Sequence, residues 1–211
     1  NLVSCSAQGT FSLTVTVLDT VGNSGSLTIN YTYDTVGPTW SSSPVSNSAI
    51  KANTALSFAA NEPIQSTGIT VVAPGCTLDT ITPSGQNVIT NLVSCDAQGN
   101  FSLTVTAKDS LGNSGSDTMI YTYDSVPPGL NASLANNTAM KVNTALSFTA
   151  NEAIQSTGIT FVAAGCTFGT PTLSGQNVTA NLMNCTEQGN FSLTVTVMDV
   201  AGNAGNLSIE Y

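Results

Sequence analysis

A strict internal repeat constrains this sequence more than any other feature. Residues 1–16 return at 91–106 and again at 181–196, so the offset is 90 residues each time. The other half of the repeat recurs too, because residues 53–77 match 143–167 at the same offset. Self-similarity at a fixed period is typical of one structural unit copied along a chain. We therefore expect tandem modules.

The linkers between the repeats predict where each module begins and ends. Asp34 and Asp124 each end a strand-like run and are followed within four residues by Pro38 or by Pro127-Pro128. Proline cannot donate to a β-ladder, so strand pairing stops there. We expect both ends of the sequence to lie inside a module of a longer array. The predicted parts are the C-terminal part of a truncated module at 1–35, a complete module at 36–125 and a nearly complete one at 126–211.

Each module is predicted to consist of β-strands. Phe101, Leu103, Val105 and Ala107 alternate with polar residues, which is the pattern of a strand with one buried face. Turn-forming Gly, Asn and Pro recur every 8–12 residues, a spacing typical of sandwiches and barrels. The predicted strands of the complete module lie near 38–43, 54–61, 68–74, 77–82, 87–94, 100–108 and 116–123. Seven antiparallel strands predict an all-β fold of tandem immunoglobulin-like β-sandwiches.

Two short motifs resemble those of bacterial Ig-like repeats. The run Asp19-Thr-Val-Gly22-Asn23 recurs at 109–113 and 199–203 and resembles the Asp-x-x-Gly-Asn hairpin of those domains. The segment 57–63, Ser-Phe-Ala-Ala-Asn-Glu-Pro, is similar to the Ser-Glu-Pro run after their second strand. Such repeats form stalks in large surface adhesins. The resemblance implies a structural stalk or fibre segment of an extracellular, cell-surface protein.

The composition argues against several functional classes. The formal net charge is −9, and the chain has three basic residues, all lysine, and no histidine. Nothing here could neutralise a row of nucleic-acid phosphates. The usual general bases and anion clamps are also mostly absent, so we expect no catalytic residues and no enzyme. The sequence contains no run of eighteen apolar residues, so we expect no membrane insertion of this segment.

The five cysteines follow the repeat. Cys76 and Cys95 have the same separation as Cys166 and Cys185, so each of the two later modules carries one pair, and Cys5 aligns with Cys95. The ends of the strands that carry each pair should meet at one pole of the sandwich, which predicts a disulfide. Two buried free thiols are the alternative. A disulfide favours an oxidising, extracellular compartment.

Acidic residues are predicted to gather where modules meet. The alternating strand directions bring Asp34, Glu62 and Asp109 to one pole, and the same logic gathers the copies Asp124, Glu152 and Asp199. Carboxylates and carbonyls are the ligands that Ca²⁺ prefers, so calcium is a candidate ion, with no other cofactor expected. The alternative is that Asp109 and Asn113 cap a tight turn in which Gly112 has a positive φ, and that the linker acids are solvated.

The expected partners are neighbouring repeats, and two further possibilities remain open. The repeats could bind a glycan or protein ligand on a host or cell surface, or other copies of the chain in a filament. Trp40, Tyr33 and Tyr123 are the aromatic residues near the linkers that a sugar site could use. We expect Lys51 and Lys141, which lie in polar loops, to be solvated.

Overall fold

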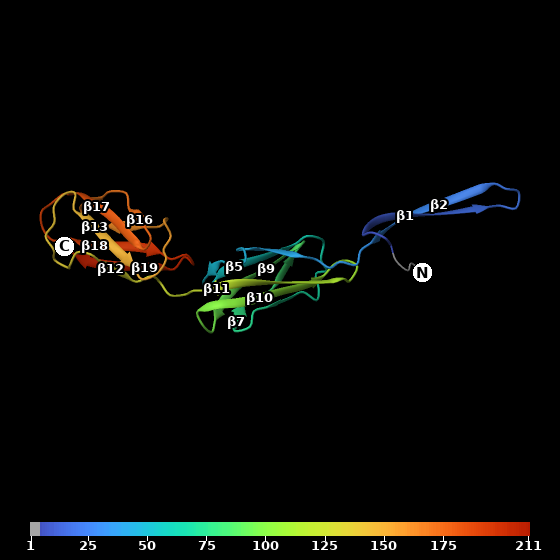
Figure 1. Cartoon of the computed structure of the whole chain (residues 1–211), viewed down its shortest axis with the longest axis horizontal. Helices are drawn as coiled ribbons and strands as arrows, with labels where there is room; N and C mark the ends of the chain where they lie inside the picture. The colour runs from blue at the N-terminus through green and yellow to red at the C-terminus, as the bar shows by residue number, and fades with distance from the viewer. Residues whose placement is uncertain (1–4) are drawn as a thin grey trace.

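The structure is a computed structural model that describes residues 5–211. It is an elongated chain of three β-units placed end to end, with the N-terminal hairpin at one end and the C-terminus at the other (Figure 1). The described residues include no helix long and apolar enough to cross a membrane.

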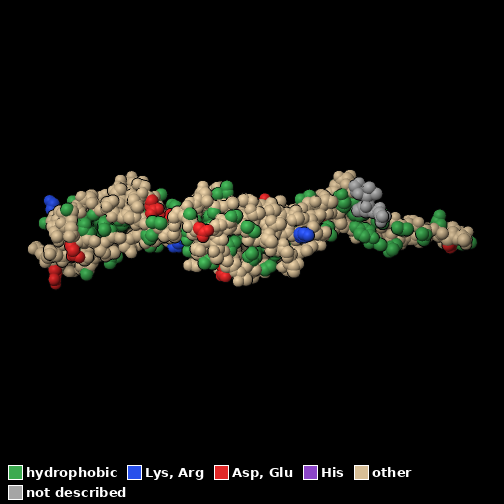
Figure 2. Space-filling model, turned by 90° about the horizontal axis from the view of Figure 1, so that it is seen from below, with side chains coloured by type: hydrophobic (Ala, Val, Ile, Leu, Met, Phe, Trp, Pro, Cys, Tyr) green, Lys and Arg blue, Asp and Glu red, His purple; other side chains and the backbone are tan. Residues whose placement is uncertain are grey.

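The first unit is a single β-hairpin. Strands β1 (Gly9–Leu18) and β2 (Ser24–Tyr33) pair antiparallel along their whole length. Its apolar residues Leu13 and Val15 are 49% and 53% exposed. The copies Leu103 and Val105 in the next unit are fully buried. The hairpin therefore carries one half of a core without the opposite sheet, and its apolar side chains lie on the surface in Figure 2.

The middle unit is a β-sandwich of two sheets. Its first sheet has the order β3-β5-β9-β7, with β8 paired to β9; the second has the order β4-β11-β10-β6. The strands of the first sheet are β3 (Trp40–Ser43), β5 (Thr54–Ala60), β7 (Cys76–Leu78), β8 (Thr82–Ser84) and β9 (Asn87–Cys95). Those of the second are β4 (Ala49–Ile50), β6 (Thr70–Val72), β10 (Gly99–Lys108) and β11 (Ser114–Tyr123).

The core of this sandwich comes from the alternating residues that the sequence identified. Phe58 and Val88 of the first sheet and Leu103 and Tyr121 of the second are fully buried in one cluster. Because side chains alternate across a strand, their polar neighbours face solvent. The fold is an immunoglobulin-like β-sandwich, as predicted.

The strand division differs in two places from the sequence prediction. Residues 77–82 form the end of β7 and the start of β8, separated by residues 79–81, and the N–H of Asp79 binds the Asn91 carbonyl at 2.9 Å. The added strand β4 pairs parallel with the end of β11, with Ile50 opposite Tyr123. Pro44, which has no N–H, separates β3 from this second pairing.

The last unit repeats the sandwich. One sheet has the order β12-β13-β17-β15, with β16 paired to β17, and the other has the order β14-β18-β19. The first sheet contains β12 (Leu130–Ala132), β13 (Ala145–Ala150), β15 (Cys166–Phe168), β16 (Thr172–Ser174) and β17 (Asn177–Cys185). The second contains β14 (Thr160–Val162), β18 (Ser192–Met198) and β19 (Ala204–Glu210).

Candidate functional site at the module junctions

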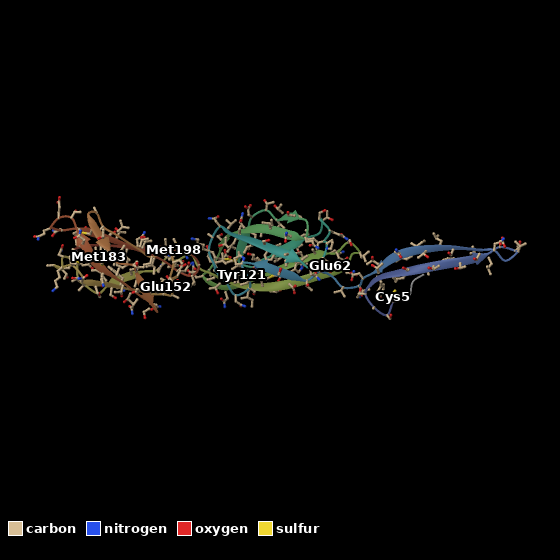
Figure 3. The ribbon with its side chains drawn as sticks, turned by 90° about the horizontal axis from the view of Figure 1, so that it is seen from above. Cys5, Glu62, Tyr121, Glu152, Met183 and Met198 are labelled. Atoms are coloured by element: carbon tan, nitrogen blue, oxygen red, sulfur yellow. A yellow bond between two sulfur atoms is a disulfide. The ribbon has the colours of Figure 1, made fainter. Side chains whose placement is uncertain are left out.

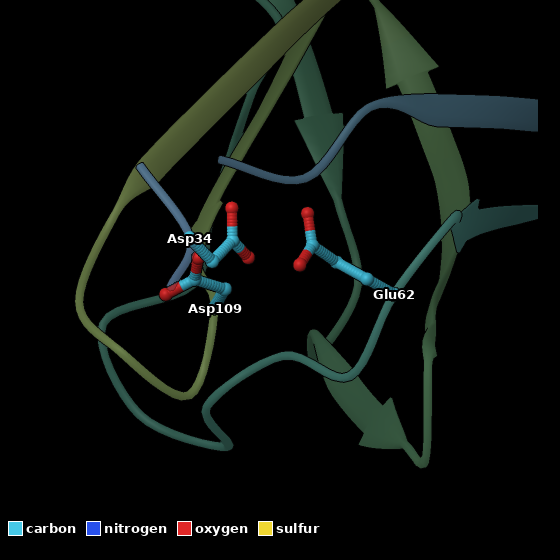
Figure 4. A group of neighbouring side chains, drawn as sticks. All are labelled: Asp34, Glu62 and Asp109. Atoms are coloured by element: carbon cyan, nitrogen blue, oxygen red, sulfur yellow. The ribbon is translucent and has the colours of Figure 1, made fainter. Parts of the chain in front are cut away.

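Three carboxylates from separate segments converge at the first junction. Asp34 follows β2 in the incoming linker, Glu62 follows β5, and Asp109 follows β10 (Figure 4). One carboxylate oxygen from each lies within 4.8 Å of the others. Glu62 lies at the end of the middle sandwich that faces the N-terminal hairpin (Figure 3). The residues predicted to meet here therefore do so.

The second junction contains the same arrangement one repeat later. Asp124 follows β11, Glu152 follows β13 and Asp199 follows β18, and their carboxylate oxygens also lie within 4.8 Å of one another. Asp199, like its copy Asp109, is buried, and the other acids are half-buried. Two copies with the same geometry make this a property of the repeat.

Asp109 also caps the hairpin turn between β10 and β11. Its Oδ1 accepts hydrogen bonds from the N–H groups of Leu111 at 2.8 Å and Asn113 at 2.9 Å. Gly112 has a φ of 94°, which only glycine adopts readily. The capped turn and the carboxylate cluster are thus both present, and the turn holds Asp109 in place within the cluster.

Two members of the cluster, Glu62 and Asp109, have pKa values shifted in opposite directions. Burial raises the pKa of Glu62, and the nearby charges of Asp34 and Asp109 raise it further. Burial likewise raises the pKa of Asp109, but the hydrogen bonds from Asn113, Leu111 and Gly112 together outweigh it, so this pKa is lowered. The acid inside the turn is therefore held as a carboxylate, while burial and then repulsion favour the protonated form of Glu62.

Glu152 occupies the corresponding position in the second junction. Its pKa is raised by burial and then by the charges of Asp124 and Asp199. No Lys side chain lies within ion-pair distance of these acids among residues 5–211. Each cluster is therefore a concentration of negative charge that a bound cation would relieve.

The asparagine that ends each turn was predicted only as a turn cap, and its contact with the linker was missed. Nδ2 of Asn113 donates to Oδ2 of Asp109 at 2.7 Å and to the backbone carbonyl of Asp34 at 3.1 Å. Nδ2 of Asn203 makes the same two bonds, at 2.8 Å to Asp199 and 3.0 Å to the Asp124 carbonyl. One side chain therefore ties the turn of a module to the linker that enters it.

A glycine in the last strand of each sandwich lets the linker approach closely. A Cβ on Gly115 would lie 1.8 Å from the carbonyl oxygen of Pro38, and one on Gly205 would lie 1.9 Å from that of Pro128. The copy in the N-terminal hairpin, Gly25, has no atom within 4 Å of its Cβ position. This glycine recurs at the same position of each repeat, within a polar strand segment. That recurrence is the sequence signal that could have identified it.

The expectation that both lysines are solvated is wrong for Lys51. Its Nζ donates to the carbonyl of Gly202, which belongs to the hairpin turn of the next module, and its side chain is half-buried. The copy Lys141 is exposed. The sequence did not reveal this role, because the acceptor is a backbone carbonyl with no side-chain signature.

The structure contains both expected disulfides. Cys76 pairs with Cys95 and Cys166 with Cys185, and in each pair the two cysteines lie opposite each other on adjacent antiparallel strands. Among residues 5–211, Cys5 is the cysteine that remains free. It lies at the base of the N-terminal hairpin (Figure 3).

No protein family model and no curated protein sequence match this chain. Similar solved structures include the Yersinia pseudotuberculosis adhesin InvE, with a TM-score of 0.34 and 16% identity over 82% of this chain and 58% of that one. Drosophila N-cadherin EC1-4 has a TM-score of 0.33 and 15% identity over 96% of this chain and 57% of that one. Domains 5-6 of the S-layer protein SbsC have a TM-score of 0.32 and 10% identity over 84% of this chain and 98% of that one.

The chain thus spans just over half the length of the adhesin structure. All three TM-scores are below 0.5, so these likenesses do not indicate a function for this chain.

Proposed function

We propose that this chain is a non-catalytic segment of an extracellular stalk, in which Ig-like modules act as spacers that hold a distant functional part away from a cell surface. The observation that carries this proposal is that both junctions are built from the same contacts. Asn113 and Asn203 hold the carbonyls of Asp34 and Asp124 in the same way. A repeated junction orients successive modules alike, which is what a regular rod requires.

The disulfides support a location outside the cell. Bonds such as Cys76–Cys95 persist in oxidising compartments and are rare in the cytosol. The chain also lacks histidine and arginine altogether, which leaves little chemistry for catalysis. Both features fit a stable, non-catalytic extracellular segment.

We propose Ca²⁺ as the ion that the carboxylate clusters take. Calcium–oxygen distances are about 2.3–2.6 Å, so two ligand oxygens on one ion lie no more than about 5 Å apart. The mutual separation of the oxygens of Asp34, Glu62 and Asp109, within 4.8 Å, meets that limit. Since Asp34 comes from the preceding module, an ion held here would bridge two modules and neutralise their repulsion.

A glycan-binding role for the repeats receives less support. A sugar platform needs exposed aromatic faces, but Tyr123 is only 6% exposed and Trp40 packs partly buried against the core of its own module. No observation on the described residues favours a particular ligand.

Small-angle X-ray scattering of the 211-residue chain tests the spacer role. The longest strands of the three units have ten, ten and nine residues, which at about 3.4 Å per residue, together with the linkers, should give a rod of about 100 Å or more. A compact chain of this length would have a radius of gyration of about 17 Å. A measured radius near that value would contradict the proposal.

A further inference from the structure

A glutamine side chain extends the last ladder of each module into the linker. Oε1 of Gln98 accepts the N–H of Ser125 at 2.9 Å, and its Nε2 donates to the Ser125 Oγ at 2.5 Å. Gly99 of β10 is paired with Tyr123 of β11, so Gln98 and Ser125 lie just beyond the paired strands. The side-chain amide therefore takes the place of one more backbone pair.

The first junction repeats this contact. Oε1 of Gln8 accepts the N–H of Thr35 at 2.9 Å, and its Nε2 donates to the Thr35 Oγ1 at 2.5 Å. Ser and Thr both supply the hydroxyl, so the contact is retained although the residue changes. Its recurrence at both junctions marks it as part of the repeat and not an incidental surface contact.

With this glutamine in place, no linker N–H of the second junction is left without a partner. The N–H of Val126 binds Oδ1 of Asp124 at 3.0 Å, and that of Gly129 binds Oδ1 of Asn151 at 2.8 Å. The two residues between them, Pro127 and Pro128, have no N–H. Proline also fixes φ, so few conformations remain open to this linker.

The module that the linker leaves also touches the next module directly. Asp124 is bound through its N–H to the carbonyl of Ile50 at 2.9 Å, next to Lys51. The Lys51 Nζ and the Asp124 carbonyl then contact the same turn, at Gly202 and Asn203. Gln98 thus binds a linker whose Asp124 also contacts the following module.

We infer that Gln98 and its copy Gln8 are positioning residues that join each linker rigidly to the module it leaves, so that hydrogen bonds fix the orientation of neighbouring modules without a bound cation. The inference rests on the proposed spacer function and gives the physical origin of its stiffness. It separates two roles: the glutamine sets orientation, and the carboxylate cluster sets the response to calcium.

The test is nuclear magnetic resonance of the full chain in EDTA, with residual dipolar couplings measured for both sandwiches. In the unsubstituted chain, we expect residues 36–125 and 126–211 to share one alignment tensor. Gln98→Ala should give two different tensors, while the thermal melt of the middle sandwich, followed by Trp40 fluorescence, stays unchanged. A purely stabilising role would change the melt and leave the tensor shared.

The matched control is Gln188→Ala, the same position in the last module. Gln188 makes no side-chain hydrogen bond within the part of the chain that the structure describes, so this variant should keep one tensor. One shared tensor in Gln98→Ala, or two tensors already in the unsubstituted chain, would overturn the inference. The scattering experiment stays separate: a compact particle with a shared tensor refutes the spacer and leaves the role of Gln98 intact.

Discussion

Asn113 and Asp34 are joined across the first junction by a hydrogen bond of 3.1 Å, from the Asn113 Nδ2 to the Asp34 backbone carbonyl. The same Nδ2 binds Oδ2 of Asp109 at 2.7 Å. Because an amide nitrogen carries two hydrogens, one serves the turn and the other the linker. In the N-terminal hairpin, Asn23 binds Asp19 at 2.8 Å and makes no such linker contact among the described residues.

The first prediction is that Asn113→Ala destabilises the middle sandwich. The change removes both hydrogen bonds and leaves the buried Asp109 with fewer donors, so we expect a loss of about 1–2 kcal/mol in the free energy of unfolding. Urea denaturation followed by Trp40 fluorescence isolates this module, because Trp40 is the one tryptophan of the chain.

Asn100→Ala is the control for this change. Asn100 is exposed and its Oδ1 accepts a 2.7 Å bond from the Thr122 Oγ1 in the same sandwich. Removal of this exposed bond should change the stability by less than about 0.5 kcal/mol. Equal losses in the two variants would show that the junction contact adds nothing.

The second prediction concerns the glycine beneath the linker. Gly115→Ala places a Cβ 1.8 Å from the carbonyl oxygen of Pro38, so the linker or β11 must shift. We expect a loss of about 1–3 kcal/mol, the usual range for overpacking, seen as an earlier Trp40 transition. Gly25→Ala, at the same position of the repeat but in open space, should leave the circular-dichroism melt of the chain unchanged. An unaltered Trp40 transition in Gly115→Ala would mean that the linker is not seated there.

The sequence predicted the features that depend on periodicity and on chain direction. The alternation at Leu103 and Val105 gave the buried face of β10, and the alternating strand directions brought Asp34, Glu62 and Asp109 together. Both arguments use only which end and which face of a strand a residue occupies. Such information is fixed by the sequence once the strands are known.

Contacts to backbone atoms were not predictable in this way. Gln98 binds a linker N–H, and Lys51 binds a backbone carbonyl. Gly115 allows the linker to approach because it has no side chain. Their partners carry no residue-specific signal, so each looked like an ordinary polar or small surface residue. Only their recurrence at a 90-residue offset could have identified Gln98 and Gly115 as candidates.

The third prediction concerns the disulfide of the middle sandwich. Replacing Cys76 and Cys95 by Ser removes a link across 19 sequence positions, which the chain-entropy description values at about 3 kcal/mol. We expect the Trp40 transition to occur at correspondingly lower urea. Cys5→Ser removes a free thiol and should have no such effect. Mass spectrometry of a non-reduced digest that finds another pairing would refute the assignment.

The fourth prediction concerns calcium. Millimolar Ca²⁺ should raise the melting temperature of both sandwiches, because each has one carboxylate cluster, and EDTA should reverse the change. Titration calorimetry should detect two sites in the 211-residue chain. Mg²⁺ at the same concentration serves as the control for charge screening. No heat of binding and a melting temperature insensitive to EDTA would leave only the turn-capping role of Asp109.

The last prediction is that Glu62→Gln stabilises the cation-free protein while weakening its affinity for calcium. Burial and the charges of Asp34 and Asp109 raise the pKa of Glu62, so its ionised form opposes folding at every pH above its folded-state pKa. Glutamine keeps the shape without the charge, and the variant should therefore unfold at higher urea than the unsubstituted chain in EDTA at pH 7.5. Below about pH 4, where a glutamate is protonated in the unfolded chain as well, the difference should vanish. Asp96→Asn removes an exposed carboxylate from the same sandwich and controls for the change in net charge. A gain that persists unchanged at low pH, or that Asp96→Asn reproduces, would show that repulsion within the cluster is not its cause.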